Sequence, residues 1–435
     1  MRQVDLAIRD GRVVAVADRG ALDLRALGLE GAEVVDASGL HVLPGVIDAH
    51  VHFREPGLEY KEDWASGSQA AVMGGVTCVL EMPNTVPPTD RAEHVREKQR
   101  LAEGRSWVDF GLFGLLARGG LERMRPMAQA GVIGFKCFLG ETTGALPAPD
   151  DAELLSALRE AASLRLRVGF HAEDRAIIAL LVEAAQAGGR TDAMAHAETR
   201  PIEAEVTAIT HACRLAADAR AAIHVHHLSS MAGMSAVEAG RAQGVDITAE
   251  VTPHHLLLST DDIERVGSVT RVNPPLRPPG EGAALMEALA KGGIEMVASD
   301  HAPHTRAEKT RRDVWQVSPG FSGVEILLPL LLSAVRAGQL TLHDVVRVTS
   351  DGPARAWGIH PRKGAIAVGA DADLTLVDLS RESVIDQDRL SGKEPVTPFH
   401  GHSTVGAAVS TIVRGRLVML EGRLVGDPSG RMVRP

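Results

Sequence analysis

Short apolar runs alternate with amphipathic segments through the middle of the chain. Eight runs have the length of buried strands: 46–53, 76–82, 109–116, 131–139, 166–173, 222–230, 246–253 and 294–300. Between them, apolar residues recur at helical spacing, as in Val206, Ile209, Cys213 and Ala216. Eight strands that alternate with helices predict an α/β fold, a (β/α)8 barrel of the TIM type.

A doubly wound open sheet would show the same alternation. Such sheets usually carry a glycine-rich phosphate-binding turn after the first strand, whereas here that strand ends in His50-Val51-His52. The barrel is therefore the preferred prediction.

The two ends of the chain differ from the middle because they alternate as short strands separated by turns. The segments with this pattern are 4–16 around Asp10-Gly11, 34–35, 40–43, 364–369, 373–378 and 405–418 around Arg414-Gly415. We expect residues 1–47 and 361–435 to form together a small β-sandwich domain, and residues 48–360 to form the barrel domain.

Composition places the chain among ordinary globular proteins, with 45% hydrophobic and 23% charged residues. The 46 basic and 56 acidic residues give a net charge of −10, without a Lys/Arg-rich run, so we expect neither nucleic acid nor an anionic membrane as a partner. The apolar stretch 326–335 is too short to span a bilayer, and the N-terminal residues lack the apolar core of a secretory signal.

The cysteines point to a reducing compartment. Cys78, Cys137 and Cys213 are widely spaced and form no Cys-x-x-Cys pair, which argues against a disulfide framework and a thiolate zinc site. We therefore expect a cytoplasmic protein.

The strongest candidate chemistry begins at the end of the first barrel run, where His50 and His52 occupy positions i and i+2 of a strand. Both imidazoles then point to one face and can converge on a metal ion. Alone this pattern is weak, because about one such pair is expected by chance among 18 histidines, and His-x-His recurs at His224/His226 and His400/His402.

Ligand-type residues at the ends of other runs strengthen the metal hypothesis. His171 ends the fifth run, His227 ends the sixth and Asp300 ends the eighth. The carboxyl ends of barrel strands surround a single mouth, where active sites lie. A histidine hydrogen-bonded in a packed core would explain one of these residues, but not all of them together.

Lys136 is unusual because it lies inside the apolar run 131–139. Burial disfavours the charged amine and lowers its pKa, so the side chain could serve as a nucleophile or be modified. The alternative is an amine that reaches water from the end of the strand.

These residues belong to longer segments that resemble the dihydroorotases, cyclic-amide hydrolases of the amidohydrolase superfamily. The similar segments are 44–57 with His-Phe-Arg-Glu-Pro-Gly, 82–85 with Met-Pro-Asn-Thr, 273–277, 300–304 and 369–374. The resemblance covers essentially the whole chain. It implies reversible ring opening of L-dihydroorotate to N-carbamoyl-L-aspartate, a reaction of pyrimidine biosynthesis.

The resemblance also implies a binuclear zinc site. His50, His52 and Asp300 would bind one Zn²⁺, His171 and His227 would bind the second, and Lys136, carboxylated to N6-carboxylysine, would bridge them. Asp300 would also be the catalytic residue that moves the proton. Relatives that hold an additional metal suggest His226 and Glu250 as further candidates.

For the substrate, the resemblance points to Arg54, Asn84 and His304 as partners of a carboxylate and to Asn273 at the polar edge of the ring. Thr142, in the polar segment 140–146, is a candidate loop contact. The alternative for Arg54 is a surface salt bridge to a nearby glutamate.

Three alternatives concern function and assembly. Allantoinases and hydantoinases share the bridging lysine, and residues 313–316 are similar to allantoinases, although the Phe-Arg-Glu-Pro arrangement favours dihydroorotase. A catalytically inactive scaffold for aspartate transcarbamoylase would typically have lost metal ligands, and here the full set is present. We expect a homodimer, with aspartate transcarbamoylase as the alternative partner.

Overall fold

The computed structural model describes residues 2–140 and 146–435. At its centre, eight parallel strands are paired in chain order: β4 (Val46–Val51), β5 (Val76–Glu81), β6 (Asp109–Leu116), β7 (Gly134–Phe138), β8 (Val168–His171), β9 (Ile223–Val225), β10 (Ile247–Val251) and β11 (Met296–Val297). His52 N donates to His301 O (2.7 Å), so the chain after the first strand lies beside the chain after the last. The predicted barrel is confirmed.

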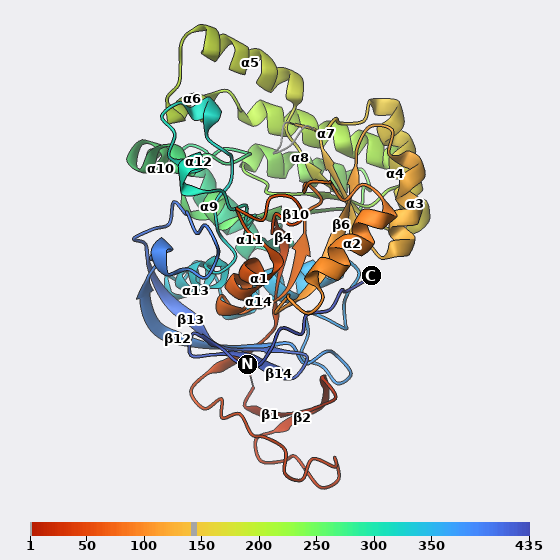
Figure 1. Cartoon of the computed structure of the whole chain (residues 1–435), viewed down its shortest axis with the longest axis vertical. Helices are drawn as coiled ribbons and strands as arrows, with labels where there is room; N and C mark the ends of the chain where they lie inside the picture. Colours follow the sequence, from red (N-terminus) through yellow and green to blue (C-terminus); the bar gives the residue numbers. More distant parts are fainter. Residues whose placement is uncertain (1, 141–145) are drawn as a thin grey trace.

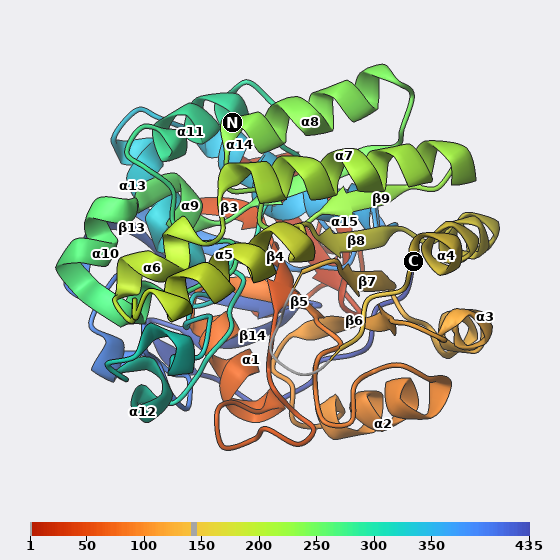
Figure 2. The same cartoon turned by 90° about the horizontal axis from the view of Figure 1, so that it is seen from above.

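Helices surround these strands (Figure 2). The longer ones are α1 (Trp64–Met73), α2 (Ala92–Ala102), α3 (Leu121–Ala130), α4 (Asp151–Leu164), α5 (Arg175–Ala187), α7 (Ile202–Ala219), α8 (Met231–Ala242), α11 (Glu281–Ala290) and α13 (Leu327–Arg336). Shorter ones are α6 (Ala193–Glu198), α9 (Pro253–Leu257), α10 (Thr260–Val266), α12 (Arg306–Lys309), α14 (Leu342–Val346) and α15 (Gly352–Ala356). The helical spacing around Val206 is confirmed by α7.

The barrel strands are buried on both faces, which explains why they read as continuous apolar runs. Every residue of β4, β5 and β6 is buried. Local sequence signals mark both ends of the helices. Helix α4 begins at a capping box in which Asp150 accepts from Glu153 N (3.0 Å), and it ends at Arg165, which has the left-handed conformation.

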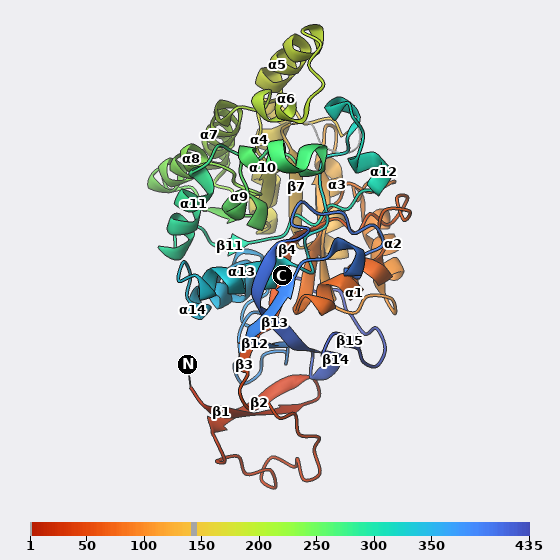
Figure 3. The same cartoon turned by 90° about the vertical axis from the view of Figure 1, so that its left-hand side faces the viewer.

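Two antiparallel sheets lie below the barrel in Figures 1 and 3. One is the hairpin β1 (Val4–Arg9) and β2 (Arg12–Asp18). The other has the order β15 (Arg423–Leu424), β14 (Arg416–Leu420), β13 (Ser403–Val413), β12 (Leu374–Val384) and β3 (His41–Pro44). Leu6 and Ile8 of the hairpin pack against the cluster that contains Leu374 and Leu376, so both ends of the chain share a small core.

Two of the predicted terminal strands are wrong. Val34 and Val35 are exposed, Val34 by 81%, and among the described residues they neither form a strand nor pair with one. Residues 364–369 are bounded by Gly364 and Gly369 with φ of 80° and 91°, which turns the chain instead of extending it. The division into 1–47 with 361–435 and 48–360 remains a proposal.

None of the helices in the described residues is long and apolar enough to cross a bilayer.

Candidate metal centre

A cavity lies at the carboxyl ends of the barrel strands. Among the residues that line it are nine that the sequence singled out: His50, His52, Arg54, Asn84, Lys136, His171, His227, Asn273 and Asp300. They lie on, or in the segments that follow, seven different strands, and the barrel brings them together. Thr142 lies outside the described residues.

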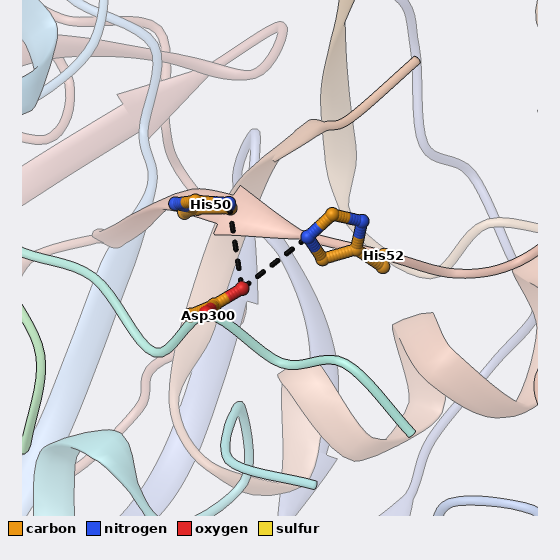
Figure 4. A group of neighbouring side chains, drawn as sticks. All are labelled: His50, His52 and Asp300. Carbon is orange, nitrogen blue, oxygen red and sulfur yellow. Dashed lines mark ion pairs between the residues drawn. The ribbon is translucent and has the colours of Figure 1, made fainter. Parts of the chain in front are cut away.

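The first group of candidate ligands is His50, His52 and Asp300 (Figure 4). Asp300 Oδ1 lies 3.4 Å from His50 Nε2 and 3.2 Å from His52 Nε2. Burial lowers the pKa of both imidazoles well below the usual value, so they are neutral near pH 7, the form that binds a metal. Two imidazole nitrogens and one carboxylate oxygen therefore face a common point.

The second group is His171 and His227 on the neighbouring side of the cavity. His171 Nδ1 lies 3.0 Å from His227 Nε2, and both rings are buried. Burial lowers the pKa of each, most strongly for His227. The pair thus offers two neutral ring nitrogens to one cation.

Lys136 lies on β7, lines the same cavity as these groups and is completely buried. Among the described residues, its Nζ has no hydrogen-bond partner, although it lies 5.0 Å from the centre of the Phe138 ring. Burial lowers the pKa of Lys136 to about 7, while Glu250 and Asp300 act in the opposite direction. A buried amine without a partner is costly, and a modification that turns it into a ligand would remove that cost.

Acceptors behind the candidate ligands orient the rings. His50 Nδ1 lies 2.5 Å from Glu250 Oε1, and His52 Nδ1 lies 2.8 Å from Asn84 Oδ1. Each contact leaves the opposite ring nitrogen, Nε2, directed at Asp300. Such outer partners fix the tautomer and position of metal-binding histidines.

Glu173 orients the ring of His171 in the same way, and the sequence analysis did not predict this residue. Its Oε2 lies 2.9 Å from His171 Nε2 and accepts a hydrogen bond from Arg200. Burial would raise the pKa of Glu173, but Arg200 and His171 outweigh it and lower the pKa to about 2. Its place two residues after His171 was a usable signal, because i and i+2 share a face at a strand end.

A second buried cluster lies beneath the cavity. Besides His50, Glu250 contacts His226 Nδ1 (3.1 Å), His224 Nε2 (3.0 Å) and His227 N (3.2 Å). His50, His226 and Glu250 also form a group with metal-ligand spacing. The structure therefore brings His226 and Glu250 together, and their role as ligands stays a prediction.

Backbone strain gathers at the same residues. His227, Asp300 and Arg54 have φ of 38°, 47° and 66°, in the left-handed region that residues with a side chain rarely adopt. Strain of this kind persists only where the surrounding structure enforces it, and it clusters at functional sites.

Arg54 lines the cavity instead of forming the surface salt bridge considered as an alternative. It is 1% exposed, and its Nε donates to Pro303 O (3.1 Å). Burial lowers the pKa of Arg54 to about 10, so the guanidinium remains charged near neutral pH.

His304 does not line the cavity but lies behind Arg54, its Nε2 3.1 Å from Arg54 Nη2. Lys61 Nζ lies 2.9 Å from His304 Nδ1, and Lys61 also pairs with Glu308 (2.9 Å). As placed here, His304 can orient Arg54, and its direct contact with a substrate remains a prediction.

The donor set fits divalent cations of the zinc type. Zinc prefers imidazole nitrogen and carboxylate oxygen, which these two groups supply without any thiolate. Lys136 lines the same cavity and its buried Nζ has no hydrogen-bond partner among the described residues, so a modified Lys136 could supply a further ligand.

A family model described as "Amidohydrolase family" matches residues 41–418. The chain belongs to the amidohydrolase family. The match spans the barrel and most of the second antiparallel sheet, so the candidate centre lies wholly within the amidohydrolase part of the chain. Members of this family generally use a binuclear metal site, in agreement with the two ligand groups.

Relatives in the family carry different names. A dihydroorotase of Halobacterium salinarum is 43% identical, with 99% of each chain covered. An allantoinase of Rubrobacter xylanophilus is 41% identical, with 100% of this chain and 98% of the relative covered. The chain is thus a cyclic amidohydrolase that is similar to both.

Among solved structures, an L-hydantoinase (dihydropyrimidinase) of Arthrobacter aurescens superposes with a TM-score of 0.95 at 33% identity, over 99% of this chain and 96% of that one. The amidohydrolase fold therefore extends over both the barrel and the terminal sheets.

Proposed function

We propose that the protein is a binuclear zinc dihydroorotase, which interconverts L-dihydroorotate and N-carbamoyl-L-aspartate in pyrimidine biosynthesis. The observation that carries the proposal is the buried Arg54 guanidinium in the wall of the cavity that holds His50, His52 and Asp300. Dihydroorotate bears a carboxylate beside its cyclic amide, whereas allantoin and simple hydantoins do not. A guanidinium binds a carboxylate through two parallel hydrogen bonds.

In this proposal His50, His52 and Asp300 would hold one Zn²⁺, His171 and His227 would hold the second, and Lys136, as N6-carboxylysine, would be a ligand shared by both. When bound, the pair of ions polarises the amide carbonyl and activates a water for attack. A neutral Lys136 amine can react with CO₂, and the lowered pKa of Lys136, about 7, keeps a large neutral fraction available.

Asp300 is the proton carrier of the proposed reaction. Burial raises the pKa of its carboxyl to about 7, against the opposing effect of Lys136. A carboxylate that holds a cation through one oxygen keeps its second oxygen free to accept and release a proton. In hydrolysis Asp300 takes the proton of the attacking water and delivers it to the ring nitrogen as the carbon–nitrogen bond breaks.

The remaining polar residues of the cavity orient the substrate. Arg54 binds the carboxylate, and Asn84, which lines the same cavity and contacts His52, is its second partner. Asn273, which also lines the cavity, meets the polar edge of the ring. Phe138, Val272 and Pro319 supply the apolar surface against which the ring packs.

Turnover of L-dihydroorotate by the zinc-loaded enzyme, followed by its loss of absorbance, tests the proposal. We expect Arg54→Gln to lower kcat/KM for dihydroorotate about 100-fold, as loss of a charge-assisted bidentate contact predicts. Arg336 is exposed, so Arg336→Gln is the matched control and should leave kcat/KM for dihydroorotate unchanged. Bound zinc without dihydroorotate turnover would reject dihydroorotase while keeping the metal site.

Allantoinase is the second candidate, favoured by the 41% identical allantoinase of Rubrobacter xylanophilus. Residues 313–316, whose sequence resembles allantoinases, pack on residues 190–191 through Val314 N to Thr191 O (2.9 Å) and Trp315 Nε1 to Arg190 O (2.7 Å). They do not line the cavity. Parallel assays with allantoin and a hydantoin distinguish these substrates from dihydroorotate.

We further propose a cytoplasmic homodimer, with aspartate transcarbamoylase as the alternative partner. Light scattering of the purified chain, alone and with added aspartate transcarbamoylase, distinguishes the two assemblies.

A further inference from the structure

A second cavity lies among the terminal sheets, far from the candidate metal centre. It has a volume of about 430 Å³ and brings together Arg12, Arg414, Arg416 and Arg431 with Asp10 and Asp371. We name this the arginine pocket. Its walls come from the β1–β2 turn, the chain before β12, the β13–β14 turn and the C-terminal residues.

The position of the arginine pocket follows from the barrel. Asp109 is the first residue of β6, and it pairs with Arg414 and accepts from Arg431 N (2.8 Å). The pocket therefore lies at the amino ends of the strands, opposite the cavity that holds His50 and Asp300. Figure 1 shows the same arrangement, with the terminal sheets below the barrel.

Two tight turns pack on each other to form the pocket. Gly11 and Gly415 have φ of 79° and 71°, and a Cβ on Gly11 would lie 3.0 Å from Arg414 O. Gly415 N donates to Ala372 O (2.8 Å), and Ala372 N donates to Gly11 O (2.8 Å). These contacts hold the arginine backbones close together in a defined arrangement.

Two of the four guanidinium groups, those of Arg416 and Arg431, have no partner within the described part of the chain. Arg12 donates to Gly369 O (2.9 Å), and Arg414 pairs with Asp109. Within residues 2–140 and 146–435, the exposed side chains of Arg416 and Arg431 form no ion pair or hydrogen bond. Arg414, Arg416 and Arg431 all line the same pocket, and repulsion from Arg431 and Arg416 adds to burial in lowering the pKa of Arg414 to about 10.

Carboxylates balance part of this positive charge, since Asp109 pairs with Arg414 and both Asp10 and Asp371 line the pocket. The chain carries a net charge of −10, so its overall field repels anions, and arginines left near one another repel each other. Of the acidic residues in the pocket, Asp371 is committed to Lys363 (3.1 Å). An anion bound between Arg416 and Arg431 would remove the repulsion, and guanidinium groups match phosphate oxygens bidentately.

We propose that the arginine pocket binds a diphosphate group, either as inorganic diphosphate or as part of a nucleoside diphosphate. More than one phosphate is expected because the pocket, at about 430 Å³, is larger than a single phosphate needs, and both Arg416 and Arg431 line it. Bound there, the ligand would join the β1–β2 turn to the β13–β14 turn and to the C-terminal residues.

Calorimetric titration of the zinc-loaded full chain with inorganic diphosphate, and separately with ADP, tests this proposal. We expect one site per chain, weakened at least about tenfold in the Arg416→Gln/Arg431→Gln variant. Equal affinity for both probes would show that the pocket recognises the phosphates alone. Tighter binding of ADP would show that the pocket also contacts the nucleoside. Hydrolytic activity without the ligand should be unchanged, because neither residue contributes to the metal centre.

Arg336→Gln/Arg389→Gln is the matched control, since it removes two exposed arginines outside the pocket and should bind as the unaltered chain does. The proposal is overturned by the absence of saturable binding at constant ionic strength. It is equally overturned by binding that persists in the Arg416→Gln/Arg431→Gln variant, which would place the anion at the zinc centre, or by binding that the control variant loses to the same extent.

Discussion

At the scale of single residues, burial is the main cause of the unusual protonation states in the cavity. It keeps His50 and His52 neutral and raises the pKa of Asp300 to about 7. Neutral imidazoles are the form that binds a metal ion, and a carboxylate beside the reacting atoms can transfer a proton. The same physical effect thus prepares both the ligands and the proton carrier.

Asp300→Asn separates these two roles. Asparagine retains an oxygen near His50 and His52 but cannot accept a proton, so we expect kcat to fall about 10²–10⁴-fold. Metal content, measured by mass spectrometry, should fall much less than kcat.

The exposed Asp218→Asn variant is the control and should retain full kcat. If Asp300→Asn kept more than a tenth of the activity with its metal bound, another group would have to carry the proton.

At the scale of elements, β8 shows how a strand is fitted to the site. A Cβ at Gly169 would lie 2.1 Å from His226 Nε2 and 2.7 Å from His226 Cδ2. Glycine therefore leaves room for the ring of His226, which packs against Glu250 and Trp357. Gly169 also precedes His171 by two residues on the same strand.

Gly169→Ala should lower the free energy of unfolding by about 1–3 kcal/mol, because the buried His226 ring must shift. Displacement of β8 should also weaken zinc binding through His171. Chemical denaturation and zinc titration measure the two effects.

Gly188→Ala, at the end of α5, is the matched control, since its Cβ would meet only ordinary contacts of 3.4 Å. Equal stability of the two alanine variants would show that His226 moves without cost and would contradict this account of β8.

At the scale of the whole molecule, Glu325 ties the start of the α13 region to the segment between β12 and β13. It accepts from Ser391 N (2.7 Å) across 66 positions of sequence. Burial raises the pKa of Glu325 to about 7, and the nearby Glu62 adds to the increase. The contact therefore responds to pH.

The direction of that response follows from proton linkage. Between about pH 4.5 and about pH 7 the folded chain holds a proton on Glu325 that the unfolded chain has lost, so its contribution to stability falls as pH rises. Glu325→Gln cannot titrate. We expect it to gain about 1–2 kcal/mol relative to the unaltered chain between about pH 5 and about pH 8, after allowance for solvent screening.

Denaturant unfolding at both pH values measures this difference, and the exposed Glu122→Gln variant controls for the loss of one charge. A stability difference between Glu325→Gln and the unaltered chain that is the same at both pH values would contradict the raised pKa.

The sequence supported much of the fold because buried strands and amphipathic helices leave periodic patterns. The strands predicted at 34–35 and 364–369 were wrong, because an alternating pattern shows that a segment can pair but not whether a partner strand lies beside it. Glu173 was missed for a related reason. Its value to the site comes from His171 and Arg200, and Arg200 is remote in sequence.

By itself, the sequence determined the eight-stranded barrel, the placing of candidate ligands at strand ends, and the resemblance to cyclic amidohydrolases. Local patterns suffice there, because hydrophobic periodicity and strand direction are properties of short segments. The tertiary structure alone decided the burial of Arg54, the place of His304 behind it, and the meeting of four arginines below the barrel. These depend on distances between segments far apart in the chain, which no local pattern records.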